Sequence, residues 1–222
     1  MYWIIFGVIT FLSWAVSASL KRKFKKYSQQ PIKLTGREVA EKMLYENGIT
    51  DMNVTSVEGQ LTDHYNPTNR TVNLSESVYN EANVAAAAVA AHECGHALQH
   101  ATAYAPLRFR SWMVPALSFT NKYMPWIILA GMLLLEYTPI PLEVGIALFA
   151  LTTLFSFITL PVEINASRRA IAWLEEAGIT DRETTPMAKD ALRSAAYTYV
   201  VAALSSLATL LYYIFILVGR RN

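Results

Sequence analysis

The chain has 222 residues, of which 53% are hydrophobic and 16% are charged, and its formal net charge at pH 7 is +2. The apolar residues gather in long blocks, which excludes an ordinary water-soluble domain and indicates a protein embedded in a membrane. No nucleic-acid motif, phosphate-binding loop or internal repeat is present, and the single cysteine, Cys94, excludes an internal disulfide.

Four apolar segments predict membrane spans, because a hydrocarbon core of about 30 Å requires roughly 20 apolar helical residues. Residues 2–20 carry no formal charge and follow no basic stretch, which predicts a retained anchor and not a cleaved signal peptide. Residues 142–160 and 197–218 predict two further spans. Residues 124–137 are apolar but short, so a span there requires the helix to begin upstream of Phe119. Together, the segments at 124–137 and 142–160 predict a transmembrane hairpin over 123–160.

Basic residues indicate how these spans are oriented. The run of Lys and Arg over 21–26 follows the first span directly, and basic residues beside a span favour the cytoplasmic side. With four spans, 17 of the 19 Lys and Arg fall on that side, and Arg220 and Arg221 are the exceptions. The predicted order is a first span at 1–20, a cytoplasmic portion at 21–122, the hairpin at 123–160, cytoplasmic helices at 161–196, and a last span with its tail at 197–222.

The portion between the first two spans has mixed secondary structure. Thr35 and Glu38 have the spacing of a capping box and predict a helix over 36–47. Short strands are predicted at 53–57, 62–65 and 71–74, forming a small antiparallel sheet. Beyond the hairpin, residues 163–174 and 185–199 predict two helices. The predicted fold class is therefore mainly α: a polytopic membrane protein with four transmembrane helices and a small α+β soluble portion of zincin type.

The third predicted strand is the one nearest in sequence to the motif discussed next. An extended peptide can pair with an exposed edge strand through its backbone alone. The strand residues Thr71, Val72, Asn73 and Leu74 therefore give a hypothesis for a substrate-binding edge, and a purely scaffolding role for this strand is an equal alternative.

The sequence His92-Glu93-Cys94-Gly95-His96 has the pattern of a zinc hydrolase site. It follows an alanine-rich run from Ala85 that favours a helix, and residues four apart lie on one helical face, so both imidazoles can bind one ion. Glu93 is the candidate general base for a zinc-bound water. Cys94 stands at a variable position and is interpreted as a small buried residue. Gly95 indicates either close packing or room for substrate.

A catalytic zinc ion takes three protein ligands, so one more ligand is needed. The candidates are His64, His100 and a downstream acid, of which Glu163 stands out. It lies just beyond the span at 142–160, and an acid at a membrane boundary often has a functional reason. A solvated helix start at Pro161 is the alternative explanation.

Three segments together resemble the YugP-like family of neutral zinc metallopeptidases of bacterial membranes: Asp63–Pro67, His92–His100 and Pro161–Ser167. The resemblance covers nearly the whole chain, and more distantly the chain is similar to HtpX-type and CAAX-prenyl-protease-type membrane metallopeptidases. The resemblance implies that His92, His96 and Glu163 bind Zn²⁺ and that Glu93 is the general base. It also implies a multi-pass protein of a bacterial inner or plasma membrane, acting on a peptide or membrane-protein substrate.

One position departs from the distant relatives, which usually have Asp four residues after the ligand Glu, where this chain has Ser167. The predicted function is a zinc-dependent endopeptidase with its site facing the cytoplasm. A non-catalytic, zinc-stabilised membrane scaffold or chaperone-like adaptor is the alternative. A transporter is a third class, disfavoured because the predicted spans carry ionisable residues only beside the hairpin turn.

Overall fold

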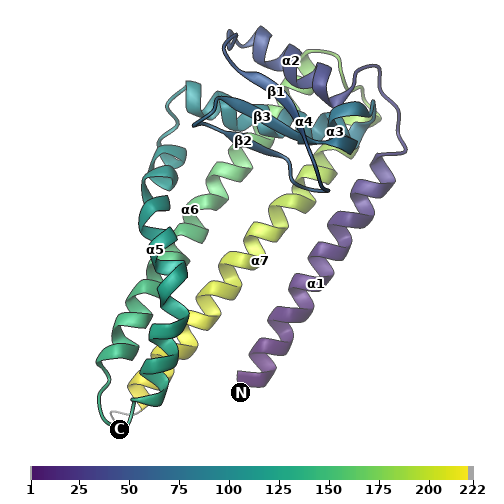
Figure 1. The fold of residues 1–222 in the computed structure, drawn as a ribbon. Coiled ribbons are helices and arrows are strands. Elements are labelled where there is room, and N and C mark those ends of the chain that lie inside the picture. The colour runs from purple at the N-terminus through teal and green to yellow at the C-terminus, as the bar shows by residue number, and fades with distance from the viewer. Residues whose placement is uncertain (1, 220–222) are drawn as a thin grey trace.

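A small head lies at one end of four long helices (Figure 1). The computed structural model describes residues 2–219. The head consists of α2 (Gly36–Glu46), β1 (Asn53–Val57), β2 (His64–Asn66), β3 (Thr71–Ser75), α3 (Glu76–Asn80) and α4 (Val84–Ala101). The long helices are α1 (Tyr2–Tyr27), α5 (Ala105–Leu133), α6 (Ile140–Glu176) and α7 (Thr184–Gly219).

The long helices run back and forth between the head and the far end of the molecule. α5 leaves the head, α6 returns to it after the turn at 134–139, and α7 leaves it again (Figure 1). The amino end of α1 and the carboxyl end of α7 lie, with that turn, at the end away from the head. α5 packs on α6, α6 on α7 and α7 on α1, so each helix mainly contacts its neighbours in this order.

Two helices within the described residues, α6 and α7, are long and apolar enough to cross a membrane. They are candidate membrane spans by length and composition, and the expectation of four spans stays a prediction. α5 begins at Ala105, well upstream of Phe119, as a span in this region requires. Its 29 residues correspond to about 43 Å of helix.

The helices expected beyond the spans are continuous with them. The helix predicted at 163–174 is the last part of α6, and the one at 185–199 is the first part of α7. Pro161 lies inside α6 and does not begin a new helix. Glu163 therefore lies on the same continuous helix as the apolar segment 142–160.

The sheet has three strands in the order β1-β3-β2, and it is mixed instead of antiparallel. β1 pairs with β3 in parallel, and β2 pairs with β3 in antiparallel fashion. The most buried strand, β3, takes the centre, with Val72 and Leu74 fully buried. The prediction of an exposed edge at Thr71–Leu74 is therefore wrong, because both sides of this strand already pair with neighbours. β2 is an edge strand instead.

Local sequence signals account well for the small elements of the head. Thr35 and Glu38 form the predicted capping box at the start of α2, and Gly48 follows the helix with a φ of +73°, a conformation that costs glycine little. Asn83 caps α4 by accepting a hydrogen bond from the Ala86 amide. The strand predicted at 53–57 is β1, whereas the second strand is shorter than predicted and begins at His64.

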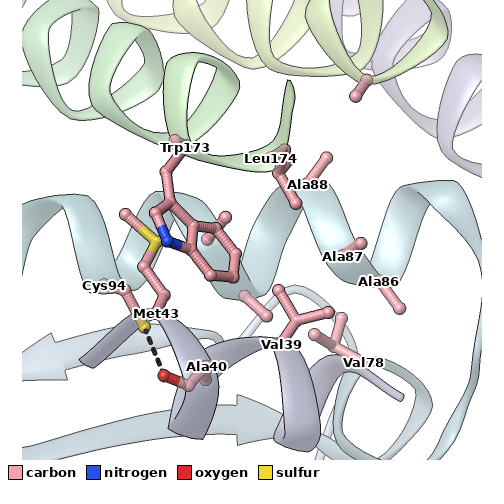
Figure 2. Packing of buried hydrophobic residues seen from close by; sticks show 14 of the residues in the cluster. Val39, Ala40, Met43, Val78, Ala86, Ala87, Ala88, Cys94, Trp173 and Leu174 are labelled. Carbon is pink, nitrogen blue, oxygen red and sulfur yellow. Dashed lines mark hydrogen bonds between the residues drawn. The ribbon is translucent and has the colours of Figure 1, made fainter. Parts of the chain in front are cut away.

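The core of the head is built around α4, whose alanines allow its neighbours to approach closely. Ala85, Ala87 and Ala88 are fully buried. α4 lies between α2 on one side and the carboxyl-terminal part of α6, with Trp173, on the other (Figure 2). Cys94 points toward α2, where its thiol donates to the Ala40 carbonyl at 3.6 Å, which fits the predicted role of a small buried residue.

Candidate metal centre

Two histidines of α4 face the same point, as their four-residue spacing predicts. His92 and His96 lie one helical turn apart, and their ring centroids are 4.8 Å apart in an edge-to-face arrangement. His96 is buried and His92 is partly buried. The helix alone brings the two rings together, because positions i and i+4 share one face.

The tertiary structure adds Glu163 from α6. Its Oε2 atom lies 3.3 Å from Nε2 of His92 and 3.5 Å from Nε2 of His96. The candidate ligand atoms of the three residues all lie within 4.8 Å of one another. Glu163 is 71 residues from His92 in the sequence, so only the packing of α6 on α4 could place it here.

These three side chains fit a zinc ion by chemistry and by spacing. Two imidazole nitrogens and one carboxylate oxygen are a common donor set for catalytic zinc. Bonds of about 2.0–2.1 Å in a tetrahedral arrangement put ligand atoms about 3.3 Å apart. The two distances to Glu163 Oε2, 3.3 Å and 3.5 Å, match that separation.

Gly95 explains how the two helices come close enough for this. A Cβ atom at this position would lie 2.6 Å from the Ala166 carbonyl oxygen on α6, far inside van der Waals contact. The glycine thus serves close packing, the first of the two explanations considered from the sequence. It permits the backbones of α4 and α6 to touch beside the candidate metal ligands.

Each candidate ligand also contacts a further side chain through the atom that faces away from the shared point. Nδ1 of His92 lies 3.1 Å from the Ser167 hydroxyl, and Nδ1 of His96 lies 3.1 Å from Oε1 of Gln99. The second oxygen of Glu163, Oε1, lies 3.6 Å from the Arg110 guanidinium. Such outer partners fix ring orientation and leave the inner atoms available to an ion.

The charges around the two rings favour a cation. Burial raises the pKa of Glu163, but hydrogen bonds with His92 and His96 outweigh it, so the pKa lies below its ordinary value. Burial lowers the pKa of His96, yet Glu163 and Glu93 together raise it above its ordinary value. Two carboxylates thus stabilise positive charge at this point.

Glu93 lies beside the candidate metal ligands and is itself buried. Its Oε2 atom accepts a hydrogen bond of 2.9 Å from the backbone amide of Tyr65 in β2. The edge strand β2 therefore positions the Glu93 carboxylate, which the sequence predicts to be the general base.

A cavity of about 390 Å³ opens onto these residues. One wall comes from β2 and the turn after it, and another comes from the first turns of α5. His64 and His100, the other candidates for the third ligand, line the cavity. Their Nδ1 atoms contact the Thr62 carbonyl oxygen and the Tyr65 hydroxyl, each at 2.7 Å. The predicted substrate strand 71–74 is not among the described residues that line it.

The structure also brings residues to the cavity that sequence reasoning missed. Arg110 reaches it from α5 and Tyr199 reaches it from α7. Tyr199 lies at the boundary of the predicted span 197–218 and Arg110 lies within the predicted cytoplasmic portion, so no local signal distinguishes either residue. Gln99 directly precedes His100 within the motif region, but its contact with α6 depends on how the helices pack.

Comparison with known proteins identifies the class to which this fold and this site belong. The chain matches, over residues 2–218, the family described as "Putative neutral zinc metallopeptidase", and it belongs to this family. It is 41% identical over 213 residues to "Putative membrane protease YugP" of Bacillus subtilis (strain 168), covering 95% of this chain and 94% of the relative. No solved structure matches the chain. The resemblance stated from the motifs is thereby confirmed.

Proposed function

We propose that the protein is a membrane-embedded, zinc-dependent endopeptidase. One observation carries the proposal: His92, His96 and Glu163 converge from two helices beside Glu93 and, with it, line a cavity. Three protein ligands leave a coordination position for water, as catalytic zinc sites require, whereas structural sites are closed by four. The family and the name of its Bacillus relative agree with this proposal.

His92, His96 and Glu163 would hold the zinc ion, which when bound acidifies a water molecule and polarises a carbonyl group. The Glu93 carboxylate would take a proton from that water and deliver it to the leaving amine. The Tyr65 amide orients this carboxylate through Oε2, so its other oxygen is available for the proton. Burial of the site limits access by bulk water and strengthens these interactions.

The membrane arrangement proposed here has four spans, with α1 and α5 added to α6 and α7. The turn at 134–139 and the outer ends of α1 and α7 lie together, away from the head (Figure 1), as this topology requires. Basic residues 21–26 follow the first span at the head end of α1. This charge pattern supports a head, and hence a metal centre, on the cytoplasmic side of a bacterial plasma membrane.

The proposed substrate is a peptide or a segment of a membrane protein. The cavity lies where the head meets the long helices, and its wall on α5 includes Leu107 and Val114. Trp112 on the same part of α5 is 73% exposed, which suits an aromatic residue at a membrane interface. A substrate anchored in the bilayer could therefore reach the cavity without leaving the membrane surface.

The test is the substitution Glu93→Gln in the purified full-length protein. The variant should bind one zinc ion per chain, as the wild type does, but its peptide hydrolysis should fall by about 10²-fold or more, since general-base catalysis contributes about 10²–10⁴-fold. Glu76→Gln, an exposed carboxylate on α3, is the matched control and should keep full activity. A chelator should abolish wild-type turnover, and added Zn²⁺ should restore it.

Normal hydrolysis by Glu93→Gln would refute the assigned mechanism. Zinc bound by four protein ligands, with no turnover of any peptide, would instead indicate the alternative of a zinc-stabilised membrane scaffold or adaptor.

A further inference from the structure

Gln99 is a fully buried polar residue with no role in the proposed reaction. It follows His96 by three residues on α4 and therefore lies on the same face of that helix. Its amide makes three contacts: Oε1 with Nδ1 of His96 at 3.1 Å, Nε2 with the Val162 carbonyl at 2.7 Å, and Nε2 with Oδ1 of Asn165 at 3.0 Å. One side chain thus joins a candidate metal ligand to α6.

The contacts fix which way the amide points. A backbone carbonyl oxygen only accepts hydrogen bonds, so the atom of Gln99 that faces Val162 must be the NH₂ group. The carbonyl oxygen of Gln99 then faces His96, and it too can only accept. His96 must therefore carry a proton on Nδ1, so the ring nitrogen that an ion would bind is Nε2, which lies 3.5 Å from Glu163 Oε2.

The same amide also sets the distance between the two helices. Gly95 touches Ala166, and Gln99 bonds to Val162. These two contacts are four residues apart on both helices, in opposite directions, so they form successive contacts of an antiparallel crossing. On α4, His96 lies between Gly95 and Gln99. On α6, Glu163 lies between Val162 and Ala166.

We propose that Gln99 is a positioning residue of the metal centre, which holds His96 in the Nδ1-protonated tautomer and holds Glu163 at ligand distance from it. The proposal rests on the zinc-binding part of the proposed function and does not need the protein to hydrolyse peptides. A carboxylate at position 99 would keep the acceptor for His96 but would lose the donor to Val162. An apolar side chain would lose both.

The substitutions Gln99→Met and Gln99→Glu separate these two contributions. Zinc affinity is measured by competition with a chelator, and the visible spectrum of the Co²⁺-loaded protein reports the ligand geometry. Gln99→Met, which nearly conserves volume, should lose about 10- to 100-fold in zinc affinity, the usual effect of removing an outer partner of a ligand, and should show an altered Co²⁺ spectrum. Gln99→Glu should lose less zinc affinity than Gln99→Met, because the acceptor for His96 is kept and only the donor to Val162 and Asn165 is lost.

Thr153→Ala is the matched control, because it removes a partly buried hydrogen bond of 2.7 Å between α6 and Ser206 of α7 without touching the candidate ligands. It should leave zinc affinity and the Co²⁺ spectrum unchanged. Wild-type zinc affinity in Gln99→Met would overturn the proposal. Equal losses in Gln99→Met and Gln99→Glu would overturn the role in orienting His96.

A measurement on the wild type keeps the proposal testable even where a variant fails to fold. The ¹⁵N chemical shifts of the zinc-loaded, histidine-labelled protein should show His96 bound through Nε2 with a proton on Nδ1. Zinc bound to Nδ1 would overturn the proposal. A wild type that binds zinc but cleaves nothing would contradict the proposed peptidase and leave the Gln99 result valid, so the two failures are distinguishable.

Discussion

Gly95→Ala is expected to damage the candidate metal centre by adding a single methyl group. The new Cβ would lie 2.6 Å from the Ala166 carbonyl oxygen, and 3.1 Å from both its carbonyl carbon and its Cα. Ordinary contact begins at about 3.4 Å, so the helices must separate by about 0.8 Å at this point. The obstructing atoms are backbone, which cannot rotate away as a side chain would.

The expected magnitude follows from two opposing terms. Overpacking costs about 1–3 kcal/mol, whereas replacing a helical glycine by alanine gains about 0.5–1 kcal/mol. We therefore expect a net destabilisation of about 1–2 kcal/mol. The effect on metal binding should be more specific, because ligand distances tolerate only about 0.2 Å of change. A shift of 0.8 Å next to His96 should weaken zinc binding about tenfold or more.

The assay combines zinc affinity, by chelator competition, with unfolding measured in detergent. Gly7→Ala is the matched control, since Gly7 is also helical and a Cβ there meets nothing within 4 Å. It should leave zinc affinity unchanged and should not lower stability. If Gly95→Ala binds zinc as tightly as the wild type and unfolds at the same midpoint, the argument from close helix packing is wrong.

Two further predictions concern the buried thiol and a contact between α1 and α7. Cys94 is fully buried, and its thiol donates a hydrogen bond to the Ala40 carbonyl. A water-soluble alkylating reagent should therefore not modify it until the protein unfolds. Rapid labelling of the folded protein would contradict this packing. Asp190 accepts hydrogen bonds from Lys23 at 2.8 Å and from Tyr27 at 2.7 Å, so Asp190→Asn should lower the free energy of unfolding by up to about 1 kcal/mol at pH 7, a value that allows for solvent screening of this partly exposed pair. Lys23 and Tyr27 lower the pKa of Asp190, so the stability contributed by the Asp190 carboxylate is present above its unfolded pKa of about 3.9 and is lost as the pH falls below that value. Hydrogen bonding to Asp190 raises the pKa of Tyr27 to about 12. The stability contributed by the Tyr27 hydroxyl is therefore lost only as the pH rises from about 10 towards 12. A difference between wild type and variant that stays constant from pH 3 to pH 7 would contradict the assignment.

Where the sequence predicted correctly, the signals were local. The capping box of Thr35 and Glu38 begins α2 as expected. The spacing of His92 and His96 puts both rings on one face of α4, because helical periodicity alone decides this. The strand at 53–57 follows from its own side chains. Each of these features depends on residues within one or two turns of one another.

The predictions that failed depended on pairing between distant segments. The sequence of β3 predicts a strand but does not say which neighbours it pairs with. In the structure this buried strand takes the central position, which removes Thr71–Leu74 from the edge and gives an edge to β2. Likewise, Pro161 reads as a helix start, but α6 continues through it. Packing against α4 and α7 stabilises a continuous helix that local propensity alone does not predict.

By itself, then, the sequence determines long apolar segments and places two imidazoles and a carboxylate on one helix, because composition and short-range spacing are properties of neighbouring residues. Only the tertiary structure places Glu163 with its oxygen 3.3 Å from His92, and only it brings Arg110 and Tyr199 to the same cavity. The physical reason is that these positions depend on how α4 and α6 cross. The crossing is set by contacts such as that of Gly95 with Ala166, between residues far apart in the chain.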